Sequence, residues 1–184
     1  MNDFTSYFIA VPLPDKWIDQ YKIFMDELKR LDSGILVSNP STLHITLFYL
    51  TKLASDQLSD IEKICSKIIN SVSKFSISVE NVVTFLRYPK ILYLNVKPKK
   101  ILADIHRLFM KELNLYAADD NNFEFIPHVT IATLPNHNDE IIQKITNTAL
   151  DIKWEFELTQ LAIYGADSKQ NPEFQKKILS IIKN

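Results

Sequence analysis

The hydrophobic positions of this chain form two similar series of predicted strands and helices. Apolar runs at residues 7–11 and 91–96 predict strands with most of their surface buried. Alternating apolar and polar residues at 74–79 and 153–158 predict half-buried strands. An apolar stripe with helical spacing follows each buried run, and its residues are Ile18, Tyr21 and Met25 in the first series and Leu102, Ile105 and Phe109 in the second.

Two His-x-Thr (HxT) strings occupy equivalent places in the two series, 84 residues apart. One contains His44 and Thr46, the other His128 and Thr130, and each lies in an apolar, strand-like run. Residues i and i+2 of a strand share a face, so each His should point the same way as its Thr while the residue between them faces the core. Two such pairs facing each other would form a phosphate-sized pocket with an imidazole on either side.

The same offset relates further positions, for example Pro14 and Pro98. The chain therefore reads as strand, helix, HxT strand, helix and strand, followed by the same series again. A duplication at this scale predicts two similar lobes rather than a repeat array. We expect a single bilobal domain over residues 1–184, with lobe one at about 1–88, lobe two at about 89–184, and strands free to exchange between them.

Composition narrows the classes of function. The net charge of −1 argues against binding of long duplex nucleic acid, which usually requires a basic surface. There are two glycines and no GxGxxG or P-loop pattern, which argues against a Gly-rich phosphate loop. The single cysteine, Cys65, excludes an internal disulfide framework and lies on an apolar helical stripe. Without a membrane-length apolar run or a signal-peptide pattern, we expect a cytoplasmic monomer that does not bind membranes.

The residue types of the two strings suit phosphodiester chemistry without a metal or other cofactor. An unperturbed His titrates near pH 6.5, so His44 and His128 can act as general base and general acid, in an order that the sequence leaves open. Thr46 and Thr130 can donate hydrogen bonds to the non-bridging phosphate oxygens. A catalytic zinc site would need three convergent ligands, and each string offers one His. The other two histidines are expected to be structural or exposed.

These strings resemble the signatures of the two-histidine (2H) phosphoesterase superfamily, in particular its bacterial-type 2′-5′ RNA ligase/2′,3′-cyclic phosphodiesterase branch. Residues 43–50 and 125–132 match the two HxT signatures, and residues 7–14, 89–94 and 161–164 resemble strands of that branch. The resemblance implies a bilobal α+β fold in which two antiparallel sheets line a central cleft, with helices outside. It also implies hydrolysis of 2′,3′-cyclic phosphate or 2′-5′ bonds in RNA ends or small nucleotides, with a 2′-phosphate as the usual product.

Five further residues are candidate substrate contacts. Phe48, Phe125 and Tyr164 could stack on a base, and Phe48 shares the face of the first HxT pair if its strand is regular. Arg87 and Lys90 lie at the junction of the two series, where they could contact an anion. Family members often carry a glycine after the first motif and an arginine after the second, and this chain has neither. The substrate contacts of relatives therefore do not carry over as a set.

Two alternatives to catalysis remain open at this point. The chain could be a nucleotide- or RNA-binding module on the same fold, with weak or lost catalysis. It could also be a structural or interaction protein in which the two HxT strings are incidental. Turnover of a cyclic nucleotide would separate the enzyme from both. Whether the reverse reaction, 2′-5′ ligation, takes place is a further question.

Overall fold

The computed structural model describes residues 4–54, 56–85, 90–134, 139–147, 152–167 and 175–183. Its helices are α1 (Ile18–Leu31), α2 (Gln57–Ser71), α3 (Lys99–Glu112) and α4 (Asp139–Asn147). Its strands are β1 (Ser6–Pro12), β2 (Leu36–Val37), β3 (His44–Leu50), β4 (Ser76–Phe85), β5 (Lys90–Lys97), β6 (His128–Leu134), β7 (Lys153–Glu157), β8 (Gln160–Ala166) and β9 (Gln175–Ile182). The predicted double series of strand, helix, HxT strand, helix and strand is present, and β2, β8 and β9 are additions to it, of which β8 contains the strand expected at residues 161–164.

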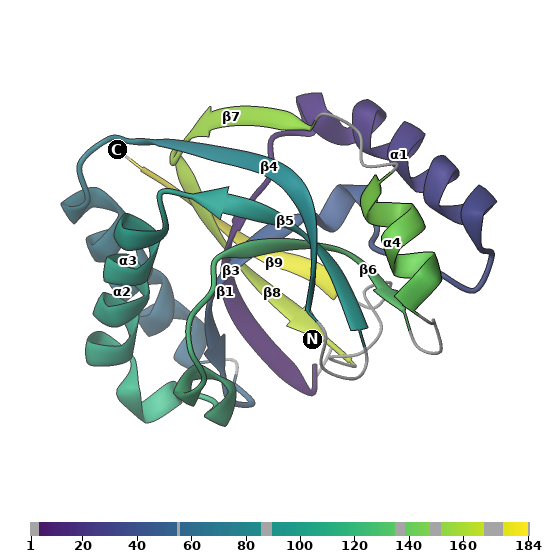
Figure 1. The fold of residues 1–184 in the computed structure, drawn as a ribbon. Coiled ribbons are helices and arrows are strands. Elements are labelled where there is room, and N and C mark those ends of the chain that lie inside the picture. The colour runs from purple at the N-terminus through teal and green to yellow at the C-terminus, as the bar shows by residue number, and fades with distance from the viewer. Residues whose placement is uncertain are drawn as a thin grey trace.

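The described strands form one curled antiparallel sheet (Figure 1). Its order is β7-β4-β5-β6-β3-β1-β8-β9, with β2 paired to β6 beside this path. We call β3, β1, β8 and β9 the β3 half, and β7, β4, β5 and β6 the β6 half. The two halves meet where the motif strands β3 and β6 pair antiparallel, at Ile45 and Val129.

The expectation of two separate sheets is therefore not met, because the motif strands join both halves into one sheet. Strands also cross the boundary that was expected near residue 88. β4 pairs with β5 and β7 in the β6 half, and β8 pairs with β1 in the β3 half. The strand β4 of the first predicted lobe thus belongs to the β6 half, and the strand β8 of the second predicted lobe belongs to the β3 half.

The helices cover the outside of the curled sheet, with α2 and α3 together at one end and α1 and α4 at the other (Figure 1). The stripe predicted on α3 is buried, and Cys65 of α2 is fully buried as a small apolar residue. On α1 the buried residues are Tyr21, Phe24 and Leu28, so the stripe lies slightly further along the helix than predicted. The fold is thus mixed α and antiparallel β, with helices outside.

The strand β1, which lies between β3 and β8, is buried on both faces. Its alternate residues Tyr7, Ile9 and Val11 belong to the main core between sheet and helices. Phe8 and Ala10 point the opposite way, into a second apolar cluster with residues of β8. The concave face of the sheet therefore carries its own apolar lining, and this lining surrounds part of the site described below.

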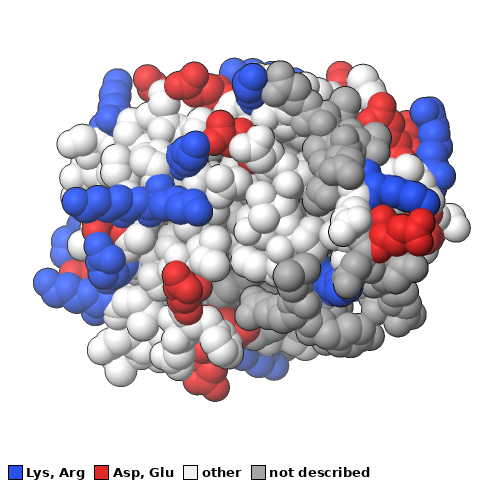
Figure 2. Space-filling model, in the orientation of Figure 1, with Lys and Arg blue, Asp and Glu red and all other residues white. Residues whose placement is uncertain are grey.

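Charged residues show no broad basic face in the view of Figure 2. Lys and Arg are more numerous on the left of this face, with Asp and Glu among them, and the described residues near its centre are mostly uncharged. Within the described part of the chain, no helix is long and apolar enough to cross a membrane.

Candidate active site

The two HxT motifs lie side by side on the central strands of the sheet. Ile45 and Val129 form the one registered pair of β3 and β6, and both side chains are fully buried in the core. Extending this antiparallel register by one residue places His44 opposite Thr130 and Thr46 opposite His128. The residues of the two strands also have the same order of buried and partly exposed side chains. Both motifs thus present His and Thr on the concave face.

Each motif histidine is anchored to the backbone in the same way. Nδ1 of His44 lies 2.6 Å from the carbonyl oxygen of Thr42, and Nδ1 of His128 lies 2.6 Å from that of Ile126. A carbonyl can only accept, so Nδ1 carries the proton in both rings. Nε2 is then the nitrogen of either ring that can exchange a proton with a ligand.

Aromatic rings enclose both imidazoles. His44 lies 4.8 Å from the ring of Phe8 and 5.0 Å from that of Tyr164, centroid to centroid. His128 lies 5.1 Å from Phe85 and 5.4 Å from Tyr93. Each histidine therefore packs against a stacked pair of rings that come from two different strands.

Burial lowers the pKa of His44 from 6.5 to about 4. The carbonyl of Thr42 opposes this shift because it stabilises the protonated ring, and the nearby His128 adds a smaller lowering. Two consequences follow. His44 is neutral at pH 7, and the two imidazoles are close enough for the charge of one to affect the other.

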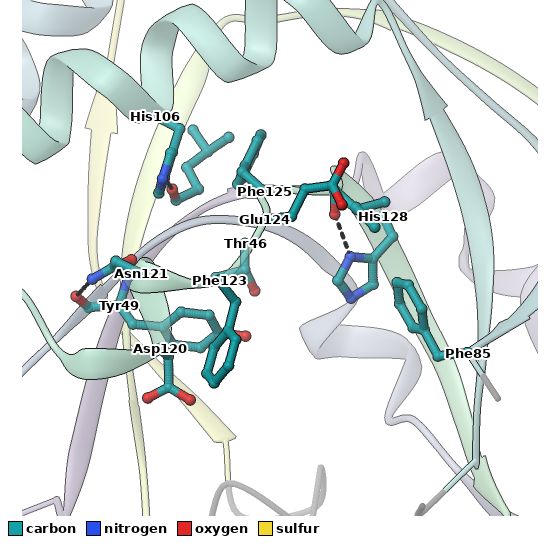
Figure 3. Close-up of a pocket in the computed structure, with 12 residues that line it drawn as sticks. Thr46, Tyr49, Phe85, His106, Asp120, Asn121, Phe123, Glu124, Phe125 and His128 are labelled. Carbon is teal, nitrogen blue, oxygen red and sulfur yellow. Dashed lines mark hydrogen bonds between the residues drawn. The ribbon is translucent and has the colours of Figure 1, made fainter. Parts of the chain in front are cut away.

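A pocket of about 620 Å³ opens beside Thr46 and His128 (Figure 3). Its volume falls in the range of about 300–1,000 Å³ that is typical of small-molecule sites. Figure 3 shows His128 and Phe85 on one side of the pocket and Tyr49 on the other. The pocket is thus large enough for a nucleoside next to the paired motifs.

Phe48 is not in this pocket, contrary to the expectation for a regular strand. Its side chain is 1 % exposed and packs against Phe109 of α3 in the core. The reason is a β-bulge. β1 pairs Ile9 with Phe48 but Ala10 with Thr46, so one extra residue of β3 reverses the alternation. Tyr49 takes the place on the pocket side that regular alternation gives to Phe48.

Of the other predicted substrate contacts, some lie at the site and others do not. Phe125 lines the pocket and Tyr164 is fully buried beside His44. Lys90 begins β5, opposite Leu134, and is not part of the described lining of the pocket. Arg87 lies outside the described residues. The structure therefore brings the two HxT pairs, Phe125 and Tyr164 together.

Several residues of the site were missed from the sequence. Phe8, Phe85 and Tyr93 contact the imidazoles from β1, β4 and β5, and Phe123 lines the pocket with an exposed ring. The alternating pattern gave the side of each strand that faces the site. It did not give the order of the strands in the sheet, which decides which rings meet which histidine.

Among the described residues, no group of three or more His, Cys, Asp or Glu side chains is arranged to hold a metal ion. His106, one of the two histidines outside the motifs, is buried on α3 and lines the pocket, with Nδ1 bonded to a backbone carbonyl. The other, His137, lies outside the described residues.

Comparison with known proteins agrees with this architecture. The RNA 2′,3′-cyclic phosphodiesterase of Methanothermobacter thermautotrophicus is 24 % identical over 143 residues, 75 % of this chain and 77 % of that protein. The protein of the same name from Archaeoglobus fulgidus is 28 % identical over 137 residues, 73 % and 75 % of the two chains.

Solved structures share the fold at low sequence identity. E. coli LigT in complex with 3′-AMP has a TM-score of 0.74 at 14 % identity, covering 98 % of this chain and 99 % of LigT. TT0787 of Thermus thermophilus has a TM-score of 0.72 at 15 % identity, covering 96 % and 97 %. The model of the 2′-5′ RNA ligase superfamily matches residues 13–170. The chain therefore belongs to the 2′-5′ RNA ligase superfamily, within the 2H phosphoesterases.

Proposed function

We propose that this protein is a metal-independent phosphodiesterase that uses its two HxT motifs to hydrolyse 2′,3′-cyclic phosphate or 2′-5′ phosphodiester bonds. The observation that carries the proposal is the pairing of two equally anchored histidines on adjacent strands. His44 and His128 have the same Nδ1 bond to the backbone, and each has a Thr from the other motif opposite it in the extended register.

The proposed reaction balances with one proton accepted and one donated. A water oxygen bonds to phosphorus while one bond from phosphorus to a ribose oxygen breaks. One imidazole takes a proton from the water, and the other gives a proton to the leaving oxygen; each role contributes about 10²–10⁴-fold. The neutral state of His44 in the free protein suits the base, which leaves His128 as the acid. The hydroxyls of Thr46 and Thr130 stabilise the charge that develops on the non-bridging oxygens.

The substrate proposed is a nucleotide or an RNA end. The relatives named RNA 2′,3′-cyclic phosphodiesterase and the 3′-AMP complex of LigT support this class. The pocket beside His128 would hold the nucleoside, with Phe125 and Tyr49 in its wall. Tyr164 would act through its contact with His44. Lys90 and Arg87 remain proposed contacts for a more distant phosphate.

The same site could run the reaction in reverse. In ligation, the oxygen of a 5′-hydroxyl would bond to the phosphorus of a 2′,3′-cyclic phosphate while the bond from phosphorus to O3′ breaks, which gives a 2′-5′ bond. One imidazole would take the proton of the 5′-hydroxyl and the other would give a proton to O3′. We further propose that the chain acts as one bilobal domain with duplicated lobes. The identical order of buried and exposed residues in β3 and β6 supports this duplication.

The test is an assay of 2′,3′-cyclic AMP and a 2′-5′ dinucleotide in the presence of EDTA. We expect turnover by the unmodified protein, and a fall in kcat of at least about 10²-fold in both H44A and H128A. Lys99, an exposed residue at the start of α3, provides the control variant K99A, which should keep full activity. Nucleotide binding without turnover would support a binding module instead, and activity lost with EDTA would point to a metal.

A further inference from the structure

Both motif strands carry a β-bulge at the equivalent position, directly after the HxT string. In β3 the extra residue is Leu47, between Thr46 and Phe48 in the register with β1. In β6 the extra residue is Ile131, because β5 pairs Leu92 with Ala132 but Tyr93 with Thr130. A bulge re-aims the side chains on either side of it. The two bulges therefore help to set the direction in which each motif faces the cleft.

Each bulge carbonyl accepts a hydrogen bond from a buried polar side chain of a helix. Nδ1 of His106, on α3, donates to the carbonyl of Leu47 at 2.8 Å. The hydroxyl of Tyr21, on α1, donates to the carbonyl of Ile131 at 2.8 Å. The side chain of His106 is 8 % exposed and that of Tyr21 is fully buried. The hydrogen bond offsets the free energy that burial of each polar group costs.

The two donors are crossed between the halves of the sheet. Tyr21 lies on the helix that follows β1, a strand of the β3 half, but its hydroxyl bonds to β6. His106 lies on the helix that follows β5, a strand of the β6 half, but its ring bonds to β3. Each helix thus holds the motif strand of the opposite half.

Both donors also contact the segment that leads into the other motif. The ring of His106 stacks on Phe125 at 4.4 Å and 7°, and the next residue, Ile126, supplies the carbonyl that anchors His128. The hydroxyl of Tyr21 also lies 3.2 Å from the carbonyl of Ser38, in the segment leading to His44. Each donor therefore contacts one bulge and the approach to the opposite motif histidine.

We propose that His106 and Tyr21 are positioning residues that hold the two bulges and thereby align the two HxT motifs with each other. This inference rests on the proposed function in that alignment matters most for a reaction that needs both motifs at one phosphorus. Tyr21 is not among the described residues that line the pocket, whereas His106 also lines it, so the role proposed for His106 is its hydrogen bond to the Leu47 carbonyl and not a contact with a ligand. The effect of losing a donor should be larger for kcat than for KM, because misplacement of catalytic groups by about 1 Å can cost about 10²-fold.

The bulge carbonyl of Ile131 has a second donor. The carbonyl of Ile131 also accepts from the backbone N–H of Ser38 at 2.9 Å. The variant Y21F removes the hydroxyl and keeps the ring, so Ile131 retains the Ser38 bond. We expect a fall in kcat of about 3–10-fold for Y21F and of about 10–100-fold for H106F, which keeps a ring against Phe125 but has no donor.

A rescue variant and a packing control separate positioning from stability. In H106N the amide nitrogen stands near the place of Nδ1, so we expect kcat within about threefold of the unmodified protein despite the lost stacking. Phe109 is fully buried on the same helix and contacts Phe48. The control F109L should lower the Tm while keeping kcat.

The measurements are kcat, KM and Tm for H106F, H106N, Y21F and F109L, together with the imidazole ¹⁵N shifts of His44 and His128. We expect those shifts to change in H106F and not in F109L, a result that needs no turnover and so is independent of the proposed function. The inference is overturned if H106F keeps full kcat, if H106N loses as much as H106F, or if the imidazole shifts are unchanged in H106F. Absence of turnover in the unmodified protein would overturn the proposed function alone.

Discussion

The two sides of the site share one arrangement of His and Thr but differ in their surroundings. His44 and His128 have the same backbone anchor, and their strands bury the same positions. Around His44 the rings of Phe8 and Tyr164 are tilted by 32° and 30° to the imidazole and belong to a closed apolar cluster. Around His128 the rings of Phe85 and Tyr93 lie edge-on, at 84° and 69°.

The pocket described above lies next to His128. Its lining includes His128 and Thr46 but neither His44 nor Thr130. The comparison suggests a division of labour. Under the proposed function, the two motifs would supply equivalent proton-transfer groups, and the unequal walls would orient a substrate with its nucleoside next to His128. Three predictions test how far the equivalence and the difference extend.

The largest effect is expected from the two threonines, where the sides should behave alike. T46V and T130V each remove a hydroxyl and keep the β-branched shape. Loss of one donor to a developing oxyanion typically costs about 10²–10³-fold in kcat, and we expect a loss in this range for both variants. Steady-state kinetics on 2′,3′-cyclic AMP measure it. A loss confined to one variant would show that the duplicated geometry does not extend to function.

An intermediate effect is expected on stability at acid pH, where the His44 side should stand out. The folded pKa of His44, about 4, is below the value of 6.5 in an unfolded chain. Between pH 6.5 and 4, His44 binds a proton in the unfolded chain but not in the folded protein. The free energy of unfolding therefore falls as the pH falls. A shift of this size corresponds to at most about 3 kcal/mol.

The variant H44N isolates this contribution. Asn keeps a donor near Nδ1 for the carbonyl of Thr42 but does not titrate. We expect the free energy of unfolding, measured with denaturant, to fall less between pH 6.5 and 4 in H44N than in the unmodified protein. The same pKa predicts that kcat/KM remains high down to about pH 5. An identical pH dependence of stability in both proteins would contradict a depressed pKa.

The smallest effect is expected from the rim of the pocket. Phe123 is 67 % exposed, so F123A should leave the Tm unchanged. If its ring stacks on the base, its loss should cost about 1–3 kcal/mol in binding and raise KM with little change in kcat. Leu115 is 87 % exposed and is not among the described residues that line the pocket, which makes L115A the matched control. Equal KM values for the two variants would remove Phe123 from the site.

The local parts of this structure could be predicted from the sequence, because they depend on spacing within one strand or helix. The HxT pairs share a face as alternation requires, and the stripe of α3 is buried as predicted. Phe48 was wrongly placed because the bulge at Leu47 is a feature of pairing with β1. A period-two pattern does not reveal an extra residue in one strand.

The long-range parts could not be predicted for the same reason. That β4 pairs with β5 and β8 with β1 decides which rings surround each histidine. The pairing of β3 with β6 joins the expected two sheets into one. His106 had no sequence signal for its role, since its partner is a backbone carbonyl of a strand 59 positions away. Its place beside the apolar stripe of α3 is consistent with burial but says nothing of its partner.

The central claim is that one histidine from each motif acts at the same phosphorus. The most direct test is the kcat of H44N, H128N and the double variant on 2′,3′-cyclic AMP with EDTA present, since Asn keeps a donor at the place of Nδ1 and removes Nε2. Groups that act as a unit give non-additive losses. We predict that each single variant loses at least about 10²-fold and that the double variant loses little more than the worse single. A single variant that keeps kcat within about tenfold of the unmodified protein would contradict the account.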